Sequence, residues 1–315
     1  MSNTAVDILV CPPELRVDAI ALVLCDLAPS QRRDIGRDIV RHADTNHDVS
    51  RALYVAVRES QLCGAAWGQF QPGNTAVFWS PRLDAGESVS PTAERLTAAV
   101  VDALDAAGVA MTQVLLPARD APDAALVEAA GFHYLTDLVY LTCERARFPI
   151  EPHVSTDLRF EPYDESQRQR LTALAERTYE DTLDCRELGG QRQMDDVIDG
   201  YMATGKFRPA NWFFVRARFA DHDGDTDVGL LLLAEYPDSN HIELIYMGLI
   251  PPARGRSWGR QIVQHAQWTA RGANCKRIVC AVDAANLPGL AVYRDTHFEI
   301  WDRRSIFLRF LKQPE

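Results

Sequence analysis

Positive charge and glycine gather in one short segment of a chain that is otherwise acidic. Residues 251–260 read PPARGRSWGR, although the 315-residue chain carries a formal net charge of -11. The segment lies between an apolar run that is expected to form a strand and a run with the pattern of a helix. A helix N-terminus offers unpaired N–H groups to an anion, and glycine lets the main chain approach that anion closely. The pattern therefore predicts a phosphate site, with a solvated basic turn as the alternative.

The apolar run before this loop carries a candidate general base. Residues 241–250, HIELIYMGLI, contain a single acid, Glu243, eleven residues before Arg254. A carboxylate among apolar side chains is expected to have a raised pKa, which suits a base that works near neutral pH through a water molecule. An edge-facing glutamate that only bonds a turn is the alternative. Gly248 in the same run indicates a bulge or a close approach of the backbone, or else a plain strand glycine.

This strand and loop resemble the first motif of the GNAT superfamily of acyl-CoA-dependent N-acetyltransferases. In that motif a central strand, usually followed by a proline, leads into Arg/Gln-x-x-Gly-x-Gly/Ala. Residues 254–259, RGRSWG, match it, with Ser257 in place of the first glycine. This departure weakens the match slightly, but serine is small and still offers its N–H, so the motif remains compatible with a cradle for a pyrophosphate.

A second motif lies further along, in residues 283–299, DAANLPGLAVYRDTHFE. It resembles the family's Asn-x-x-Ala-x-x-x-Tyr-x-x-x-Gly-Phe, with Asn286, Tyr293 and Phe298 in register. Gly289 stands where alanine is common, and His297 stands where glycine is common. The resemblance covers roughly residues 155 to 312, and a fainter copy covers the first half of the chain.

The resemblance implies a ternary complex in which an amine attacks acetyl-CoA, the co-substrate, directly. In the family the central strand splays from its neighbour, so its main chain can bind pantetheine and the thioester carbonyl. These groups here belong to Met247, Gly248 and Leu249. The loop residues implied to bind the pyrophosphate are Arg254, Gly255, Arg256, Ser257, Trp258, Gly259 and Arg260.

The resemblance also implies two catalytic residues. Glu243 occupies the strand and spacing of the family's general base. Tyr293 matches the general acid that protonates the departing thiolate, with a packed helix aromatic as the alternative. Asn286 is implied to anchor the turn before its helix and to touch pantetheine, with simple helix capping as the alternative.

Other reactive side chains fit the chemistry less well. The sequence indicates no histidine partner near Cys280, which argues against a thiol relay. His241 and His265 have no metal-ligand spacing, and no metal is expected. An acidic cluster falls where the family's first two helices shape the acceptor pocket, although a solvated face is the favoured interpretation; its members are Glu180, Asp181, Asp184, Asp195 and Asp196.

The two halves of the chain are expected to repeat one α/β (α+β) architecture, a mixed, mostly antiparallel sheet flanked by helices. A gapless alignment of the two halves that places Phe132 on Phe298 also places Pro122 on Pro288. The expected division is a GNAT-like domain over residues 1–148, a linker over 149–156 and a catalytic GNAT domain over 157–315. Two unrelated α/β domains are the alternative. The tandem arrangement is similar to that of mycothiol synthase.

The first half is expected to be a degenerate copy that binds no cofactor. The same alignment places Val127 opposite Tyr293 and Asp120 opposite Asn286. Carboxylates, including Glu94, replace the basic loop, and a carboxylate competes with a phosphate for helix N–H groups. The protein is therefore expected to be a monomer in which the two halves of the chain form a pseudo-dimer.

Composition limits the partners. Acidic net charge disfavours nucleic acid, and no apolar run approaches the length of a membrane span. Seven scattered cysteines without a CxxC pair indicate a reducing, cytoplasmic setting. The expected acceptor is a small primary amine or an exposed protein amine. The alternatives are an acyl-CoA-binding sensor or scaffold without catalysis, and an acetyltransferase similar to mycothiol synthase.

Overall fold

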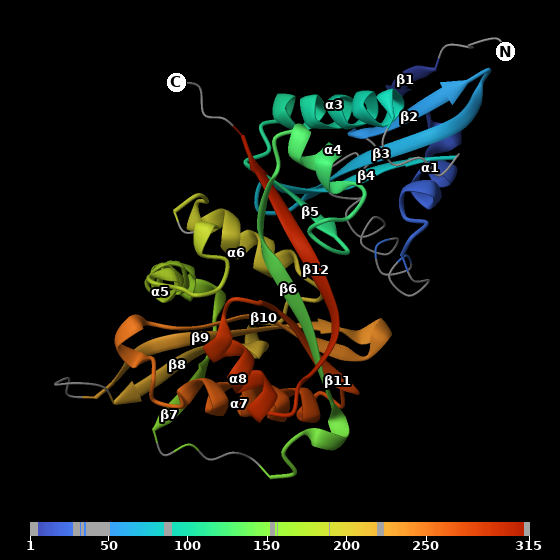
Figure 1. Ribbon diagram of the computed structural model, residues 1–315. Helices are drawn as coiled ribbons and strands as arrows, with labels where there is room; N and C mark the ends of the chain where they lie inside the picture. Colours follow the sequence, from blue (N-terminus) through green and yellow to red (C-terminus); the bar gives the residue numbers. More distant parts are fainter. Residues whose placement is uncertain are drawn as a thin grey trace. The chain divides into compact units, whose positions relative to one another are not determined.

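Figure 1 shows the computed structural model of the chain, which describes residues 6–27, 32, 35, 51–84, 90–151, 155, 157–188, 190–218 and 224–311. The chain forms two compact units. Unit 1 comprises Met1–Leu135 and Ser305–Glu315, and unit 2 comprises Thr136–Arg304. Of the expected linker, residues 152–154 and 156 lie outside the described residues.

Unit 1 contains a mostly antiparallel sheet, and among its described strands β4 and β5 form the one parallel pair. Side chains alternate between two cores, because Ala66 packs in the core of α3 while its neighbours Ala65 and Trp67 pack in the core of α1. The strands follow the order β1 (Asp7–Val10), β2 (Leu53–Arg58), β3 (Gln61–Gln71), β4 (Thr75–Leu83), β5 (Met111–Leu116) and β12 (Glu299–Phe310), and the helices are α1 (Arg16–Val23), α3 (Pro91–Ala106) and α4 (Ala124–Ala129).

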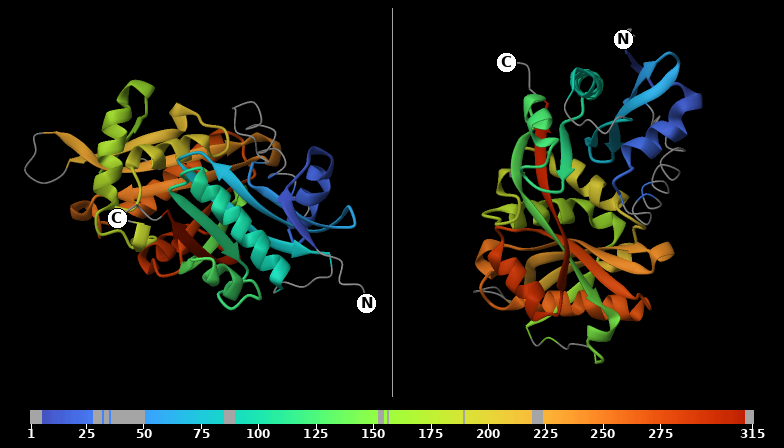
Figure 2. Two further views of the ribbon diagram at one scale, coloured as in Figure 1. Left: turned by 90° about the horizontal axis from the view of Figure 1, so that it is seen from above. Right: turned by 45° about the vertical axis from the view of Figure 1, so that its right-hand side comes forward.

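Unit 2 contains a similar sheet, with β10 and β11 as its parallel pair. Helices α5 and α6 cover one face of it and α7 and α8 cover the other (Figures 1 and 2). The strands follow the order β6 (His133–Glu144), β11 (Arg277–Asp283), β10 (His241–Leu249), β9 (Asp225–Tyr236), β8 (Trp212–Arg218) and β7 (Leu158–Pro162), and the helices are α5 (Arg168–Tyr179), α6 (Met194–Ala203), α7 (Trp258–Gly272) and α8 (Leu287–Asp295).

The last strand of each half completes the sheet of the other unit. Strand β6 follows α4 in the chain, but its residues Leu138–Glu144 pair with β11 of unit 2. Strand β12 follows α8, but its residues Ser305–Phe310 pair with β5 of unit 1. The compact units therefore differ from the division at residues 148 and 157 expected from chain order. A boundary set by linker composition cannot anticipate an exchange of strands, since strand pairing is non-local.

From β4 to β6 and from β10 to β12, the described elements of the two halves share one order, as the gapless alignment of their sequences predicts. Strands β4 and β10 begin and end at aligned positions, and so do β6 and β12. The parallel pairs also correspond. Thr75–Val77 pair with Met111–Gln113 in unit 1, and His241–Glu243 pair with Arg277–Val279 in unit 2.

Candidate active site

The arginine-rich loop joins the end of β10 to the N-terminus of α7, as the sequence predicts. Ser257 has φ 60° and ψ 12°, and Gly255 has φ 75°. The left-handed region favours glycine, which accounts for a glycine at the position of Ser257 in the motif. Ser257 is the N-cap residue of α7. Among the described residues, no side chain makes a capping hydrogen bond at this position, and the first turn of the helix holds no acid. Its N–H groups are therefore arranged to bind an anion.

The Arg254 side chain holds this loop in place. Its guanidinium donates to the carbonyl oxygens of Leu249 (3.0 Å), Thr178 (3.1 Å), Glu180 (2.6 Å) and Asp181 (2.9 Å). These bonds tie the end of β10 to the C-terminal end of α5, whose last carbonyls lack helical partners. The sequence assigned Arg254 to the pyrophosphate, whereas its guanidinium is occupied by main-chain oxygens. We therefore infer that the role of Arg254 is to hold the loop in position.

The other two arginines of the segment lie at the surface beside α7, whereas Trp258 is buried. Arg256 and Arg260 are exposed, and the guanidinium carbon of Arg256 lies 5.4 Å from the centre of the Trp258 ring. A Cβ on Gly259 would lie 3.4 Å from Val292 of α8. That is an ordinary van der Waals distance, so the packing of α7 on α8 does not itself require glycine at this position.

Strands β10 and β11 diverge next to the loop. Their parallel pairing ends at Glu243 and Val279, although β10 continues to Leu249 and β11 to Asp283. The register of β10 with β9 shifts between Leu244 and Tyr246. The bulge of β10 therefore lies at residue 245, whereas Gly248 shows the close approach that the sequence offered as the other possibility, since a Cβ on Gly229 of β9 would lie 2.4 Å from the Gly248 carbonyl oxygen. Met247, Gly248 and Leu249 follow the bulge and stay paired with β9, so the divergence opens their other edge toward β11.

Gly248 makes room for a tyrosine that the sequence analysis missed. A Cβ on Gly248 would lie 2.5 Å from the Tyr246 hydroxyl oxygen and 2.9 Å from Thr178 Cβ. The Tyr246 and Thr178 hydroxyl oxygens lie 2.7 Å apart. The Tyr246 ring stacks on Tyr179 and Tyr201, with centroids 5.3 and 5.4 Å apart. Burial raises the pKa of all three phenols, so they stay protonated at neutral pH.

Glu243 lies at the point where the two strands part. Burial raises the pKa of Tyr140 on β6 to about 12, and the charge of Glu243 adds to that rise. Burial also raises the pKa of Cys280 on β11, again with a contribution from Glu243. These effects place the Glu243 carboxylate near both side chains, on a partly exposed residue.

Tyr293 is buried in α8 with its hydroxyl against a thiol. The residue is 5% exposed, and its ring lies 5.2 Å from Phe298 at an interplanar angle of 61°. Its hydroxyl lies close enough to the Cys280 thiol for each group to shift the pKa of the other. Burial raises the pKa of Tyr293 well above its usual value, and Cys280 and Asp184 add to the rise. Tyr293 is therefore protonated at neutral pH and can donate a proton. Cys280 remains a thiol, which is a poor nucleophile.

A carboxylate network joins the loop after α5 to the end of β11. Asp184 Oδ1 accepts from the Asp283 N–H (2.8 Å), and Asp283 Oδ2 accepts from the Cys185 N–H (2.9 Å). Asp283 Oδ1 also accepts from the Thr136 hydroxyl (2.6 Å) and the Ala285 N–H (2.7 Å). The network fixes the loop that follows α5 beside the divergence of β10 and β11.

Asn286 links this network to α8. Its Oδ1 accepts from the Gly289 N–H (3.0 Å) and caps the helix, and its side chain acts to lower the pKa of the neighbouring Asp184 carboxyl. Partial loss of hydration raises the pKa of Asp184, and the charge of Asp283 adds to the rise. The sequence favoured a solvated face for the acidic cluster. Glu180, Asp181 and Asp184 are all exposed, as that interpretation expects, although the Asp184 carboxylate also accepts from the Asp283 N–H.

The histidines pack against aromatic rings. His265 stacks on Phe160 with centroids 3.7 Å apart, and His241 stacks on Tyr236 at 4.6 Å. Within the described ranges, no three His, Cys, Asp or Glu side chains cluster in a way that could hold a metal ion. No helix in that same part of the chain has the length and apolar character needed to cross a membrane.

Comparisons with known proteins agree with this arrangement. Residues 175–298, which include β10, the loop, α7, β11 and the Asn286–Phe298 motif, match the model of the acetyltransferase (GNAT) family. No curated protein matches the chain. The resemblance seen in the sequence is thus confirmed for the second half of the chain.

Solved structures extend the likeness in fold to the whole chain. A GCN5-related N-acetyltransferase from Sphaerobacter thermophilus has a TM-score of 0.68 at 12% identity, with 98% of this chain and 96% of that chain covered. A tandem GNAT protein from the clavulanic acid biosynthesis pathway has a TM-score of 0.59 at 14% identity, with 99% and 100% covered. A putative acetyltransferase from Pyrococcus horikoshii has a TM-score of 0.56 at 10% identity, with 99% and 92% covered. The fold is that of two tandem GNAT-like domains.

Proposed function

We propose that the protein is an acyl-CoA-dependent N-acetyltransferase that transfers the acetyl group of acetyl-CoA to a primary amine in a ternary complex. The observation that carries the proposal is the divergence of β10 and β11, and three features of the elements around it support the proposal. These are an α7 N-terminus without a side-chain cap, the carboxylate of Glu243, and the protonated phenol of Tyr293.

The residues of the loop fit a pyrophosphate. The N–H groups that begin α7 are held by the bonds of Arg254 to α5, and Arg256 and Arg260 add positive charge around them. The open edge of β10 at Met247 and Leu249 offers main-chain groups to a pantetheine chain that enters between the strands. Cofactor binding thus depends on the main chain at both places, with arginine charge as support.

Glu243 and Tyr293 supply the proton transfers of the reaction. Glu243 removes a proton from the attacking amine, directly or through one water molecule, as the nitrogen forms its bond to the thioester carbonyl carbon. The carbon–sulfur bond then breaks, and Tyr293 gives its proton to the departing sulfur. The products are the N-acetylated amine and CoA. Tyr293 suits this step because its burial keeps the proton on the phenol until a thiolate forms.

The discriminating experiment is an assay of CoA release with acetyl-CoA and a panel of primary amines, with the acylated product identified by mass spectrometry. An enzyme releases CoA only with an accepted amine and forms its N-acetyl derivative. A sensor or scaffold binds acetyl-CoA, seen by calorimetry, and releases no CoA with any amine. The panel includes an aminosugar-linked cysteine, because activity on it alone would favour the alternative similar to mycothiol synthase.

A further inference from the structure

An exposed tryptophan lies on the sheet of unit 2. Trp301 of β12 is 52% exposed, although tryptophan is usually buried for the most part in a folded chain. Its ring meets that of Tyr140 on β6, with centroids 5.7 Å apart and an interplanar angle of 60°. Both residues belong to unit 2, and β12 and β6 are neighbouring strands. The two rings therefore form a corner with one side open to solvent.

The pairing of the strands puts this corner on the same face of the sheet as Glu243. Tyr140 lies directly opposite Ala281 in the pairing of β6 with β11. Val279, two residues before Ala281, lies opposite Glu243 in the pairing of β11 with β10. Paired residues share a face, and so do residues two apart along a strand. Starting beside Glu243, one face thus carries a strip, here called the aromatic strip, that consists of Val279, Ala281, Tyr140 and Trp301.

The opposite face of the same strands is filled by the core. Leu141 of β6 and Cys280 of β11 alternate with the residues of the strip, and both are buried in one cluster with Tyr293 of α8. On the face of the strip Ala281 is exposed and Tyr140 is partly exposed. An amine can therefore reach the thioester from the face of Glu243, while the sulfur departs toward Tyr293 on the other face.

The surface between Glu243 and the two rings is apolar. Only the side chains of Val279 and Ala281 separate them on this face of β11. Among the described residues, the charges that act on the Tyr140 phenol come from Glu243, Arg304 and Asp302. Arg304 Nε donates to Asp302 Oδ2 at 2.8 Å, so these two charges largely offset each other. A molecule that lies on the strip therefore gains chiefly from the burial of apolar surface.

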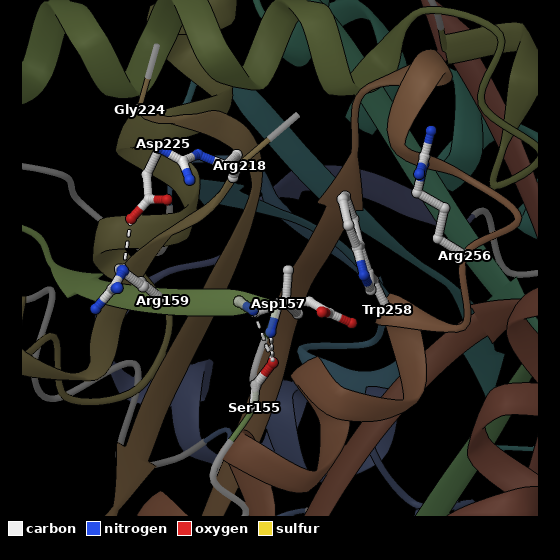
Figure 3. A pocket seen from close by; sticks show the side chains of 9 residues that line it. Ser155, Asp157, Arg159, Arg218, Gly224, Asp225, Arg256 and Trp258 are labelled. Atoms are coloured by element: carbon white, nitrogen blue, oxygen red, sulfur yellow. Dashed lines mark hydrogen bonds and ion pairs between the residues drawn. The ribbon is translucent and has the colours of Figure 1, made fainter. Parts of the chain in front are cut away.

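The aromatic strip is separate from the pocket of about 910 Å³ beside the arginine-rich loop. That pocket is lined by Arg256 and Trp258 and by residues at the ends of β7, β8 and β9 (Figure 3). None of the residues of the strip lines it. The strip therefore offers a second surface next to the divergence of β10 and β11, on the face of the candidate base.

We propose that the aromatic strip binds the body of the acceptor, and that the acceptor is a primary amine joined by a short chain to a flat aromatic ring. The inference rests on the proposed function, because it takes Glu243 as the base that receives the proton of the amine. With the nitrogen at Glu243, the chain crosses Val279 and Ala281, and the ring packs against Trp301 and Tyr140. Aromatic rings favour such edge-to-face and offset contacts.

The spacing of the strands sets the length of this acceptor. Tyr140 lies two strands away from Glu243 and two residues further along, so their Cα atoms are roughly 12 Å apart. A hydrogen bond at one end and a ring contact at the other leave room for a chain of about two carbons between nitrogen and ring. Because β6 follows α4 in the first half of the chain, the acceptor surface of the catalytic unit needs both halves.

The test measures kcat/KM with acetyl-CoA for 2-phenylethylamine, 2-cyclohexylethylamine and 1,4-diaminobutane. The cyclohexyl amine has the size of the phenyl amine without its flat ring, and the diamine has a second charge in place of the ring. The natural chain is expected to prefer the phenyl amine to the cyclohexyl amine roughly 2- to 10-fold, as for an aromatic contact, and to use the diamine least.

Trp301→Ala is expected to lose this preference and to lower kcat/KM for the phenyl amine roughly 10- to 100-fold, with the KM for acetyl-CoA unchanged. Trp301→Phe keeps a flat ring and should keep the preference. Tyr140→Leu should act in the same direction as Trp301→Ala. The matched control is Ile300→Ala, because Ile300 is 62% exposed and its side chain points to the other face of β12. It is expected to use all three amines as the natural chain does.

A natural chain that uses the cyclohexyl amine or the diamine as well as the phenyl amine overturns the assignment of the strip and leaves the proposed function standing. The same holds for a chain that acetylates other primary amines and none of these three. An unchanged preference in Trp301→Ala, or an equal loss in Ile300→Ala, also overturns it. Failure to release CoA with any amine overturns the proposed function, and this inference with it.

Discussion

The hydroxyl of Tyr293 on α8 and the thiol of Cys280 on β11 lie close enough for each to shift the pKa of the other. The pair lies below the divergence of β10 and β11, and both groups are protonated because burial raises their pKa values. A protonated phenol can give its proton to a departing thiolate, whereas a protonated thiol is a weak nucleophile. The two residues are therefore expected to differ sharply in their importance for turnover.

Tyr293→Phe is expected to lower kcat roughly 100-fold with little change in the KM for acetyl-CoA, since it removes one acid group and keeps the ring against Phe298. Steady-state kinetics with an accepted amine measures both constants. Cys280→Ala is the control, and it is expected to keep kcat within a few-fold. An unchanged kcat in Tyr293→Phe would remove Tyr293 from the mechanism, and a large loss in Cys280→Ala would return the thiol to it.

Glu243→Gln is expected to abolish the acid limb of the rate–pH profile while acetyl-CoA still binds. A general base acts only when ionised, so the rate of the natural enzyme rises with pH through the pKa of that base. Glutamine keeps the size of the side chain at the end of the parallel pairing and has no such transition. The measurement is kcat/KM for the amine against pH. An acid limb that persists in the variant would assign the base to another group.

Asp184→Asn is expected to make stability less dependent on pH. The pKa of Asp184 is raised in the folded chain, so the folded state binds more protons than the unfolded state between the ordinary aspartate pKa and the raised value. Stability therefore falls as the pH rises through that window, and asparagine removes this term. Urea unfolding from about pH 4 to pH 7 should show the free energy of unfolding of the variant rising relative to that of the natural chain as the pH increases.

Glu165→Gln serves as the control for Asp184→Asn, because Glu165 is exposed and lies outside the network of Asp283 and Asn286. Its stability should run parallel to that of the natural chain over the same pH range. A difference between Asp184→Asn and the natural chain that stays constant with pH, or that moves in the other direction, contradicts the prediction.

Gly248→Ala is expected to destabilise the fold by about 1–3 kcal/mol, because its Cβ would lie 2.5 Å from the Tyr246 hydroxyl and displace the stacked tyrosines. Chemical denaturation measures the effect. Tyr246→Phe in the same chain removes the obstructing oxygen and should recover part of the loss. Gly272→Ala, at the end of α7 with no atom within 4 Å of the added Cβ, should be neutral or slightly stabilising. Equal behaviour of the two alanine variants would refute the steric argument.

The parts of the site that the sequence predicted are those encoded in contiguous segments. The loop from Arg254 to Gly259 and the motif from Asn286 to Phe298 lie within two family signatures, and the matched residues 175–298 include both. The gapless alignment of the two halves predicted the repeated order of elements, because duplication preserves the spacing of the elements along the chain.

The parts that could not be predicted depend on contacts between distant residues. Asp184 meets the Asp283 main chain across 99 positions, and Arg254 reaches the α5 carbonyls across more than 70. No local pattern of polarity reports such contacts. The exchange of β6 and β12 has the same cause, since each strand carries the pattern of a buried strand and the pattern does not name its partner.

One chain is expected to bind one acetyl-CoA, because the first half keeps the geometry of the site and lacks its chemistry. Strands β4 and β5 also part after three parallel pairs, but Val77 stands where the second half has Glu243, and Val127 stands where it has Tyr293. Both replacements are apolar. Neither general base nor general acid is therefore present at the corresponding positions of unit 1.

The N-terminus of α3 is also closed to a phosphate. The Ser90 side chain accepts from the Ala93 N–H (3.2 Å), Pro91 has no N–H to offer, and Glu94 lies in the first turn. The nearby arginines are engaged, since Arg82 bonds Asp26 and Asp123, at 2.7 and 2.8 Å. Arg95 donates to the Val6 carbonyl oxygen at 2.9 Å. In α7 the corresponding turn has neither cap nor acid.

Isothermal titration with acetyl-CoA should therefore give a stoichiometry near one. Gly259→Glu in the second half should abolish the binding, because it places a carboxylate among the N–H groups that begin α7. Pro91→Glu is the matched control, because it places a carboxylate at the exposed start of α3 and should leave both stoichiometry and affinity unchanged. A stoichiometry near two that falls to one in each variant would mean that both halves bind the cofactor. In that case the capped N-terminus of α3 would have to open on binding, and Ser90→Ala should then strengthen the first-half site rather than leave the titration as it was.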